Sequence, residues 1–169
     1  MRLDSDMFCF QCAQTEEGTG CTTVGVCGKT SETASLQDLL VDQTKRLAFV
    51  TERQSRRDPT TTFQASDLIS KSLFATMTNV NFSSESIKSY VSQVNDMTNT
   101  LQRTATDKLP SGTIDGVTVE LESPQNMSVE ELNELGKKVG VEARKIQTGN
   151  IDVWSGREIV TYGLKGGCA

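Results

Sequence analysis

Apolar residues recur every three or four positions over most of the chain, a spacing that is typical of amphipathic helices. The clearest stripe predicts a helix over about 84–107. Its apolar members are Ile87, Tyr90, Val91, Val94, Met97 and Leu101. Similar spacing predicts helices over about 63–79 and 35–58, the latter with Ser35 as N-cap and an end before Pro59, because the residue before a proline disfavours the helical conformation. These apolar positions are expected to form the core.

Two pairs of polar residues mark the start of further helices. Ser128 with Glu131 has the spacing of a capping box and predicts a helix over about 128–139. Ser155 with Glu158 has the same spacing and predicts that the final helix begins there. All of these elements are helical, so we expect an all-α fold.

The stretch 109–127 breaks the helical pattern. Proline and glycine interrupt it at Pro110, Gly112, Gly116 and Pro124. Apolar and polar residues alternate over 117–121, which predicts a short edge strand. We therefore expect this stretch to be a surface connector between two helical groups.

The composition excludes several classes of protein. The chain has 169 residues and a net charge of -5, so it lacks the basic surface that nucleic-acid-binding proteins normally have. No apolar run approaches the roughly 18 residues of a membrane span, and the first residues are not organised as a secretory signal. The absence of histidine excludes Ser–His and Cys–His nucleophilic sites, histidine-ligated zinc, Rieske centres and histidine-held haem. We expect one cytoplasmic domain with no nucleic-acid or membrane partner.

Four of the five cysteines lie close together near the N-terminus. They are Cys9, Cys12, Cys21 and Cys27, with the spacing C-x2-C-x8-C-x5-C, and the fifth is Cys168. Disulfides are typical of secreted proteins with small cores, and four-cysteine zinc sites usually pair two close knuckles across a longer gap. Iron–sulfur clusters are held by Cys thiolates that often share one short loop. The spacing therefore favours an iron–sulfur cluster and leaves zinc and disulfides as alternatives.

The residues around these cysteines suit a shielded inorganic group. Phe8 and Phe10 alternate with the first two cysteines and are expected to screen the site from water. Glycines that allow close backbone approach occur at Gly18, Gly20, Gly25 and Gly28. Lys29 is expected either to raise the reduction potential slightly or to be a solvated or helix-start residue. Cys168 is expected to be a packing residue, with a redox-reactive thiol as the alternative.

Three residues near the C-terminal end of the sequence, outside the cysteine segment, are chemically distinctive. Trp154 is expected to be a packing or interface residue. Asp152 and Glu158 have no partner in the sequence that indicates general acid–base chemistry, so we interpret them as isolated acids.

The cysteine segment has a specific flanking sequence. The residues from Met7 to Leu40 read MFCFQCAQTEEGTGCTTVGVCGKTSETASLQDLL and resemble the start of the hybrid cluster proteins, known also as prismane proteins or hydroxylamine reductases. Members of that family open with M-F-C-x-Q-C-x-Q-T, then G-C, G-x-C-G-K and an L-Q-D-L-L helix, and every one of these elements is present. Two later stretches are also similar to the family: LISKSLFATMTNVNF, Leu68 to Phe82, and SGREIVTYGLKGGCA, Ser155 to Ala169.

The resemblance implies a cofactor and its ligands. Cys9, Cys12, Cys21 and Cys27 would hold the N-terminal cluster, and their short spacing is similar to the branch of the family with a [4Fe-4S] cluster, whereas relatives with wider spacing carry [2Fe-2S]. The family's reactive centre is a hybrid iron–sulfur–oxygen cluster held, later in the chain, by a histidine, glutamates and further cysteines. Since this sequence has no histidine and stops inside a family-like helix, we expect it to be the N-terminal part of a longer multidomain protein, without the hybrid-cluster site.

The resemblance also implies an architecture and a role. It predicts an extension over 1–6, a cluster-binding loop over 7–30 and a helical domain over 31–169, built as two three-helix bundles of which the second is incomplete. The role would be electron transfer from a redox donor protein to the reactive cluster in the remaining domains, with reduction of hydroxylamine, or of nitric oxide, belonging to the complete enzyme. The alternative is a non-enzymatic structural module in which a four-cysteine zinc or iron–sulfur site pins the N-terminal loop to the bundle.

Overall fold

The protein is all-α over the residues that its computed structural model describes, which are all except 1–6, 13, 16–17, 55–57, 105–120 and 122. Its helices are α1 (Ser31–Gln54), α2 (Pro59–Ala75), α3 (Ser84–Thr104), η2 (Pro124–Asn126), α4 (Val129–Val139), α5 (Val141–Thr148) and α6 (Ile151–Gly167). These described parts contain no strand, and their one β-type pairing is an isolated bridge between Cys9 and Cys21. The predicted fold class is confirmed.

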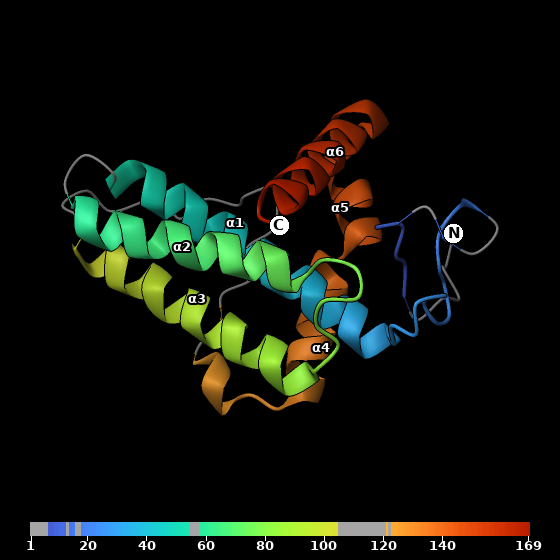
Figure 1. Cartoon of the computed structure of the whole chain (residues 1–169), viewed down its shortest axis with the longest axis horizontal. Coiled ribbons are helices and arrows are strands. Elements are labelled where there is room, and N and C mark those ends of the chain that lie inside the picture. The colour runs from blue at the N-terminus through green and yellow to red at the C-terminus, as the bar shows by residue number, and fades with distance from the viewer. Residues whose placement is uncertain (1–6, 13, 16–17, 55–57, 105–120, 122) are drawn as a thin grey trace.

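Helix α1 is the centre of the packing. Helices α2, α3 and α4 all contact it, and α1, α2 and α3 run alongside one another while α6 is set obliquely to them (Figure 1). The described apolar side chains with no exposed surface are Leu36, Leu39, Leu40, Leu47, Ala65, Ile87, Val91, Val94, Leu132 and Val139. The predicted apolar stripe of the third helix therefore faces the core, as expected.

The contact between α1 and α4 is unusually close. A Cβ placed on Gly136 of α4 would lie 2.1 Å from the backbone oxygen of Ser35 and 3.1 Å from its Cβ. Ser35 is therefore a buried residue inside α1 and not an N-cap, so that prediction is wrong. The helix begins at Ser31 instead, and the Thr30 hydroxyl accepts a hydrogen bond from the Thr33 amide at 3.1 Å.

The other predicted helix starts met different outcomes. The capping box of α4 is confirmed, because Ser128 accepts from the Glu131 amide while Glu131 accepts from the Ser128 amide. The start of the last helix at Ser155 is wrong: α6 begins at Ile151, where the Asn150 side chain accepts from two backbone amides. The sequence pattern also missed α5, a short helix of eight residues.

Helices α5 and α6 form the second helical group. They contact each other, and α6 also contacts α2. Whether this group is an incomplete three-helix bundle stays a prediction. The predicted extension over 1–6 lies outside the described residues, as do all of the predicted edge strand over 117–121 except Leu121 and most of the connector over 109–127. No helix in the described part of the chain is long and apolar enough to cross a membrane.

Candidate metal centre

A short antiparallel bridge joins the two halves of the cysteine loop. The Cys9 amide donates to the Cys21 carbonyl oxygen at 3.0 Å, and the Cys21 amide donates to the Cys9 carbonyl oxygen at 2.8 Å. At Gly20, a Cβ would lie 2.7 Å from the Phe8 ring. The bridge therefore sets Cys9 opposite Cys21, and the glycine lets Phe8 close over the backbone.

Glycine also shapes the turn around Cys27. The Gly28 amide donates to the Gly25 carbonyl oxygen at 2.7 Å, and the Gly25 amide donates to the Lys29 carbonyl oxygen at 2.7 Å. Gly28 has φ of +88°, a conformation that side chains other than glycine rarely adopt. A Cβ at Gly25 would lie only 3.1 Å from Cys27 Sγ. The backbone thus wraps tightly around this thiol.

Aromatic rings pack together where the cysteine loop meets α6. The Phe10 ring lies 5.3 Å from that of Tyr162 and 6.1 Å from that of Trp154, and Phe8 lies 5.4 Å from Phe10 between centroids. Trp154 Nε1 also donates to the Val141 carbonyl oxygen at 3.3 Å. Trp154 is therefore a packing residue, as expected, and Phe10 is held between α6 and the loop.

Tyr162 brings a polar atom to this aromatic cluster. Its hydroxyl is buried and has no hydrogen-bond partner among the described residues. Burial, and then the negative charges of Glu158 and Asp38, raise the pKa of Tyr162 above its ordinary value, with a further contribution from Cys9. The phenol thus stays protonated and has an unused donor near the cysteine loop.

Two lysines lie buried beside the loop. Lys29 is 1% exposed, and its Nζ lies 3.8 Å from Cys9 Sγ, so the interpretation of Lys29 as a solvated residue is wrong. Lys165 of α6 is 5% exposed. With the Gln11 amide oriented to suit its neighbours, its nitrogen donates to the Thr76 carbonyl oxygen at 3.0 Å and its oxygen accepts from Lys165 Nζ at 3.3 Å. Gln11 thus ties the Cys9–Cys12 segment to both α2 and α6.

A buried ion-pair network near these lysines joins α5, α6 and α1. Arg144 of α5 donates to both carboxylate oxygens of Glu158, at 2.8 and 2.9 Å, and to the Val139 carbonyl oxygen at 2.6 Å. Its guanidinium also lies 3.5 Å from a carboxylate oxygen of Asp38 on α1. The interpretation of Glu158 as an isolated acid is therefore wrong. The network ties α5 and α6 to the central helix, and α6 carries Trp154 and Tyr162 of the aromatic cluster.

The pKa values of this network follow from burial and charge. Burial opposes the charge of Arg144, but Asp38 and Glu158 raise its pKa above its ordinary value. Burial raises the pKa of Asp38 against the attraction of Arg144 and Lys165. Burial lowers the pKa of Lys165 to about 8, although Asp38 partly counteracts this shift. Lys165 is therefore a buried amine whose burial favours the uncharged form.

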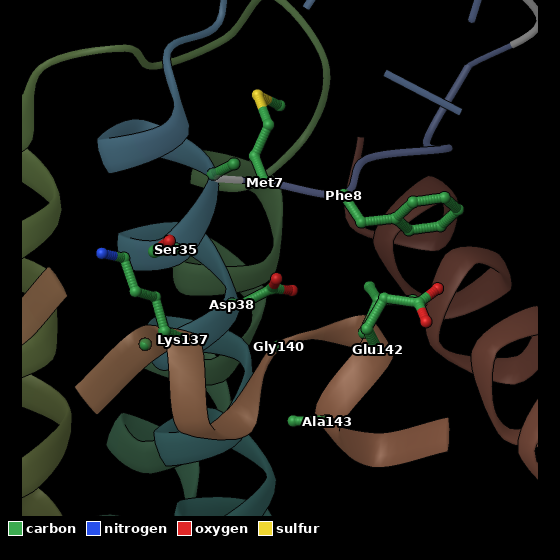
Figure 2. Close-up of a pocket in the computed structure, with 11 residues that line it drawn as sticks. Met7, Phe8, Ser35, Asp38, Lys137, Gly140, Glu142 and Ala143 are labelled. Atoms are coloured by element: carbon green, nitrogen blue, oxygen red, sulfur yellow. The ribbon is translucent and has the colours of Figure 1, made fainter. Parts of the chain in front are cut away.

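A pocket of about 220 Å³ lies between the loop and the helices. Met7 and Phe8 cover it on one side, while Asp38 and Gly140 line it on the other (Figure 2). Figure 2 shows the Asp38 carboxylate pointing into this space from α1. The pocket gives solvent limited access to the Asp38 side chain, which is 13% exposed.

The four predicted ligands are free thiols, and they do not form one close group. All five cysteines are free, and Cys21 is buried whereas the others are half-buried. Among the residues that the structure describes, no three or more Cys, Asp or Glu side chains are grouped closely enough to hold a metal ion. The structure therefore brings Cys9 and Cys21 into register but does not bring all four sulfur atoms together. Cys168 lies apart from the loop in sequence, at the C-cap of α6.

The donor set nevertheless fits an iron–sulfur cluster. It offers four thiols in one glycine-rich loop, aromatic rings that exclude water, and buried donors in Lys29 and Tyr162 that suit sulfur acceptors. If these residues hold a cluster, they form a shielded redox centre at one end of a helical domain.

Comparison with known proteins assigns the chain to a class. Residues 7–167 match the family described as the Prismane/CO dehydrogenase family, and the chain belongs to that family. Among its curated relatives are the hydroxylamine reductases of Desulfitobacterium hafniense (strain DCB-2), 37% identical over 163 residues, and of Zymomonas mobilis, 34% identical over 160 residues, each alignment covering 95% of this chain. The hydroxylamine reductase of Desulfovibrio desulfuricans is 37% identical over 164 residues, or 97% of this chain. The chain spans 28% of the length of each of these relatives. The family resemblance of the cysteine segment is thus confirmed.

Proposed function

We propose that this chain is the N-terminal iron–sulfur electron-transfer part of a hydroxylamine reductase, with a [4Fe-4S] cluster on Cys9, Cys12, Cys21 and Cys27. The observation that carries the proposal is the glycine-rich loop with four free thiols in a member of the Prismane/CO dehydrogenase family. The names of the curated relatives supply the activity, which belongs to the complete enzyme. When bound, the cluster supplies a one-electron redox centre.

The residues of this chain would serve that centre in distinct ways. Phe8, Phe10 and Trp154 exclude water from the loop, and a drier environment makes each nearby charge more effective. Lys29 donates toward the Cys9 sulfur, and the unpartnered Tyr162 hydroxyl offers a second donor nearby. Hydrogen bonds to sulfur and local burial are the means by which a protein tunes the reduction potential of such a centre.

Metal binding is expected to stabilise the fold. A metal centre held by Cys9, Cys12, Cys21 and Cys27 links separate parts of the loop, and the free energy of metal binding contributes to the free energy of folding. We therefore expect the loaded chain to unfold at a higher temperature than the metal-free chain.

The remaining domains of the enzyme would supply the reaction centre. The electron donor would be a separate protein that docks on the enzyme. We propose that hydroxylamine, or nitric oxide, is reduced at a hybrid cluster in the remaining domains, and that a redox donor protein delivers the electrons. An exposed apolar face on α6, formed by Val153, Val160 and Leu164 beside a pocket of about 450 Å³, supports contact with those domains.

Replacing single cysteines tests the ligand set. Cys12→Ser and Cys27→Ser are expected to lose most of their iron and the broad visible absorbance, because a serine hydroxyl is a poor ligand for this cluster. The anaerobically purified wild-type chain should contain about four irons, as a [4Fe-4S] cluster requires. Cys168→Ser is the matched control, since it removes a thiol outside the loop, and it should retain the wild-type iron content. Iron and sulfide analysis together with absorption spectra measure the outcome.

Measurements on the same anaerobically purified chain distinguish the proposed electron-transfer role from the structural module. A colourless chain with one zinc ion, or a Cys12→Ser variant with full iron content, would contradict the proposed site. A coloured chain that accepts no electron in a potentiometric titration with dithionite would instead favour the structural module, in which the metal only pins the loop.

A further inference from the structure

The cysteine loop lies beside two lysines whose side chains are almost completely buried. Lys29 reaches the loop from the start of α1, and Lys165 reaches it from α6; their exposures are 1% and 5%. Lysine is seldom buried without an anionic partner, because moving an unpaired ammonium group out of water is strongly unfavourable. The burial of both therefore requires a source of negative charge.

The buried carboxylates nearby are already matched. Arg144 takes both oxygens of Glu158 and also lies 3.5 Å from Asp38. No carboxylate in the described part of the chain forms an ion pair with Lys29 or Lys165. Three buried cations thus share two buried carboxylates, and one positive charge is left over.

The contacts of the two lysines show where the missing negative charge belongs. Lys29 Nζ lies 3.8 Å from Cys9 Sγ, a hydrogen-bonding distance for sulfur. Lys165 Nζ lies 3.3 Å from the side-chain oxygen of Gln11, which stands between Cys9 and Cys12 in the sequence. Both ammonium groups are therefore directed at the first cysteine knuckle.

We propose that Lys29 and Lys165 are the counter-charges of an anionic four-thiolate centre: Lys29 donates to the Cys9 sulfur, and Lys165 fixes the Cys9–Cys12 segment through Gln11. This inference rests on the proposed function. Four thiolates outweigh the positive charge of a zinc ion or of an iron–sulfur core, so either centre is anionic, whereas two disulfides are neutral. The buried lysines thus argue against the disulfide alternative.

This arrangement has a consequence for electron transfer. An added electron increases the negative charge of the centre, and a nearby buried cation stabilises that charge more than it would in water. The two lysines therefore raise the midpoint potential of the centre. They act as positioning and potential-setting residues and not as ligands.

The test replaces each lysine by a side chain of similar length without charge. Lys29→Met and Lys165→Met are compared with Lys71→Met, which removes one positive charge from an exposed pair on α2. In the anaerobically reconstituted 169-residue chain, Lys29→Met is expected to shift the one-electron equilibrium at least tenfold toward the oxidised state, a fall of about 59 mV in midpoint potential. Lys165→Met shifts it in the same direction, and Lys71→Met leaves it unchanged.

Zinc affinity gives a second measurement that needs no cluster. The metal-free Lys29→Met and Lys165→Met chains are expected to bind Zn²⁺ at least tenfold more weakly than the wild type, while Lys71→Met binds it equally well. In denaturant, the metal-free variants should be as stable as the wild type or more stable, because an unpaired buried charge has been removed. If a methionine variant fails to fold, Lys29→Gln and Lys165→Gln remove the charge and keep a polar donor.

The outcomes separate this inference from the proposed function. A loaded wild-type chain whose lysine variants keep both their potential and their zinc affinity would overturn the counter-charge role alone. So would metal-free variants that lose as much stability as the loaded ones, since the lysines would then be general structural residues. A wild-type chain that binds neither iron nor zinc would overturn both proposals.

Discussion

Replacing Gly136 by alanine is expected to destabilise the protein by about 3 kcal/mol, which lies at the upper end of the cost of inserting a methyl group into a packed interior. The new Cβ would lie 2.1 Å from the Ser35 backbone oxygen, and neither helix backbone is able to move by the required distance without disturbing the core. For a domain of this size, the loss corresponds to a fall in melting temperature of roughly 6–12 °C. Thermal unfolding of the metal-free chain measures it.

Gly156 provides the matched control for this prediction. It also lies inside a helix, α6, but a Cβ there meets no atom within 4 Å. Gly156→Ala should therefore stabilise the protein by about 0.5–1 kcal/mol, the ordinary gain in helix propensity. If both alanine variants change stability by the same amount, the close approach of α1 and α4 is not a determinant of the fold.

Replacing Arg144 by methionine is expected to cost about 3–5 kcal/mol, the usual loss when one partner of a buried ion pair is removed. The Glu158 carboxylate would lose both of its charged hydrogen bonds, and Asp38 would lose its cation. Chemical denaturation of the metal-free chain measures the change. Since this network holds α5 and α6 against α1, the variant should also expose the aromatic cluster and increase the fluorescence response of Trp154 to a quencher.

A double variant of Arg144 and Glu158 tests whether the loss comes from this ion pair. In the double variant Arg144→Met/Glu158→Met, the buried charges of the pair are removed together, so the loss should be smaller than the sum of the two single losses. Lys71→Met breaks an exposed pair with Asp67 and should leave stability almost unchanged. Strictly additive losses at Arg144 and Glu158 would mean that the two side chains do not stabilise each other.

Most of the fold follows from local sequence signals. The periodic stripe that predicted α3 and the capping box that predicted α4 both reflect interactions within a few residues, so they are visible in the sequence. The error at Ser35 lies in the choice between two nearby polar residues: Thr30 accepts from the Thr33 amide and α1 begins at Ser31, so Ser35 lies inside the helix, where α4 packs closely on its backbone. The short α5 was missed because it starts from Gly140 without a side-chain cap.

The candidate site was predicted only in part, because some of its residues come from a distant part of the sequence. The spacing of the cysteines and the adjacent phenylalanines are properties of one short segment and could be found without a structure. Lys165, Tyr162 and Glu158 reach the site from a helix more than a hundred residues away, and although the family-like stretch 155–169 contains them, no local pattern indicates that they lie beside the cysteines. The sequence does indicate Lys29 as a residue next to the last cysteine, but its burial depends on how the loop folds over α1.

The contact between Phe10 and the rings of Trp154 and Tyr162 joins residues that lie about 150 positions apart in the sequence. During synthesis, the thiols leave the ribosome first, whereas their aromatic cover and Lys165 emerge about 150 residues later. A nascent chain therefore exposes its cysteines to solvent for several seconds, at roughly 5–20 residues per second, before it can enclose them. Under the proposed function, metal can reach the thiols during this interval, and oxidation of the thiols is the hazard of the same interval.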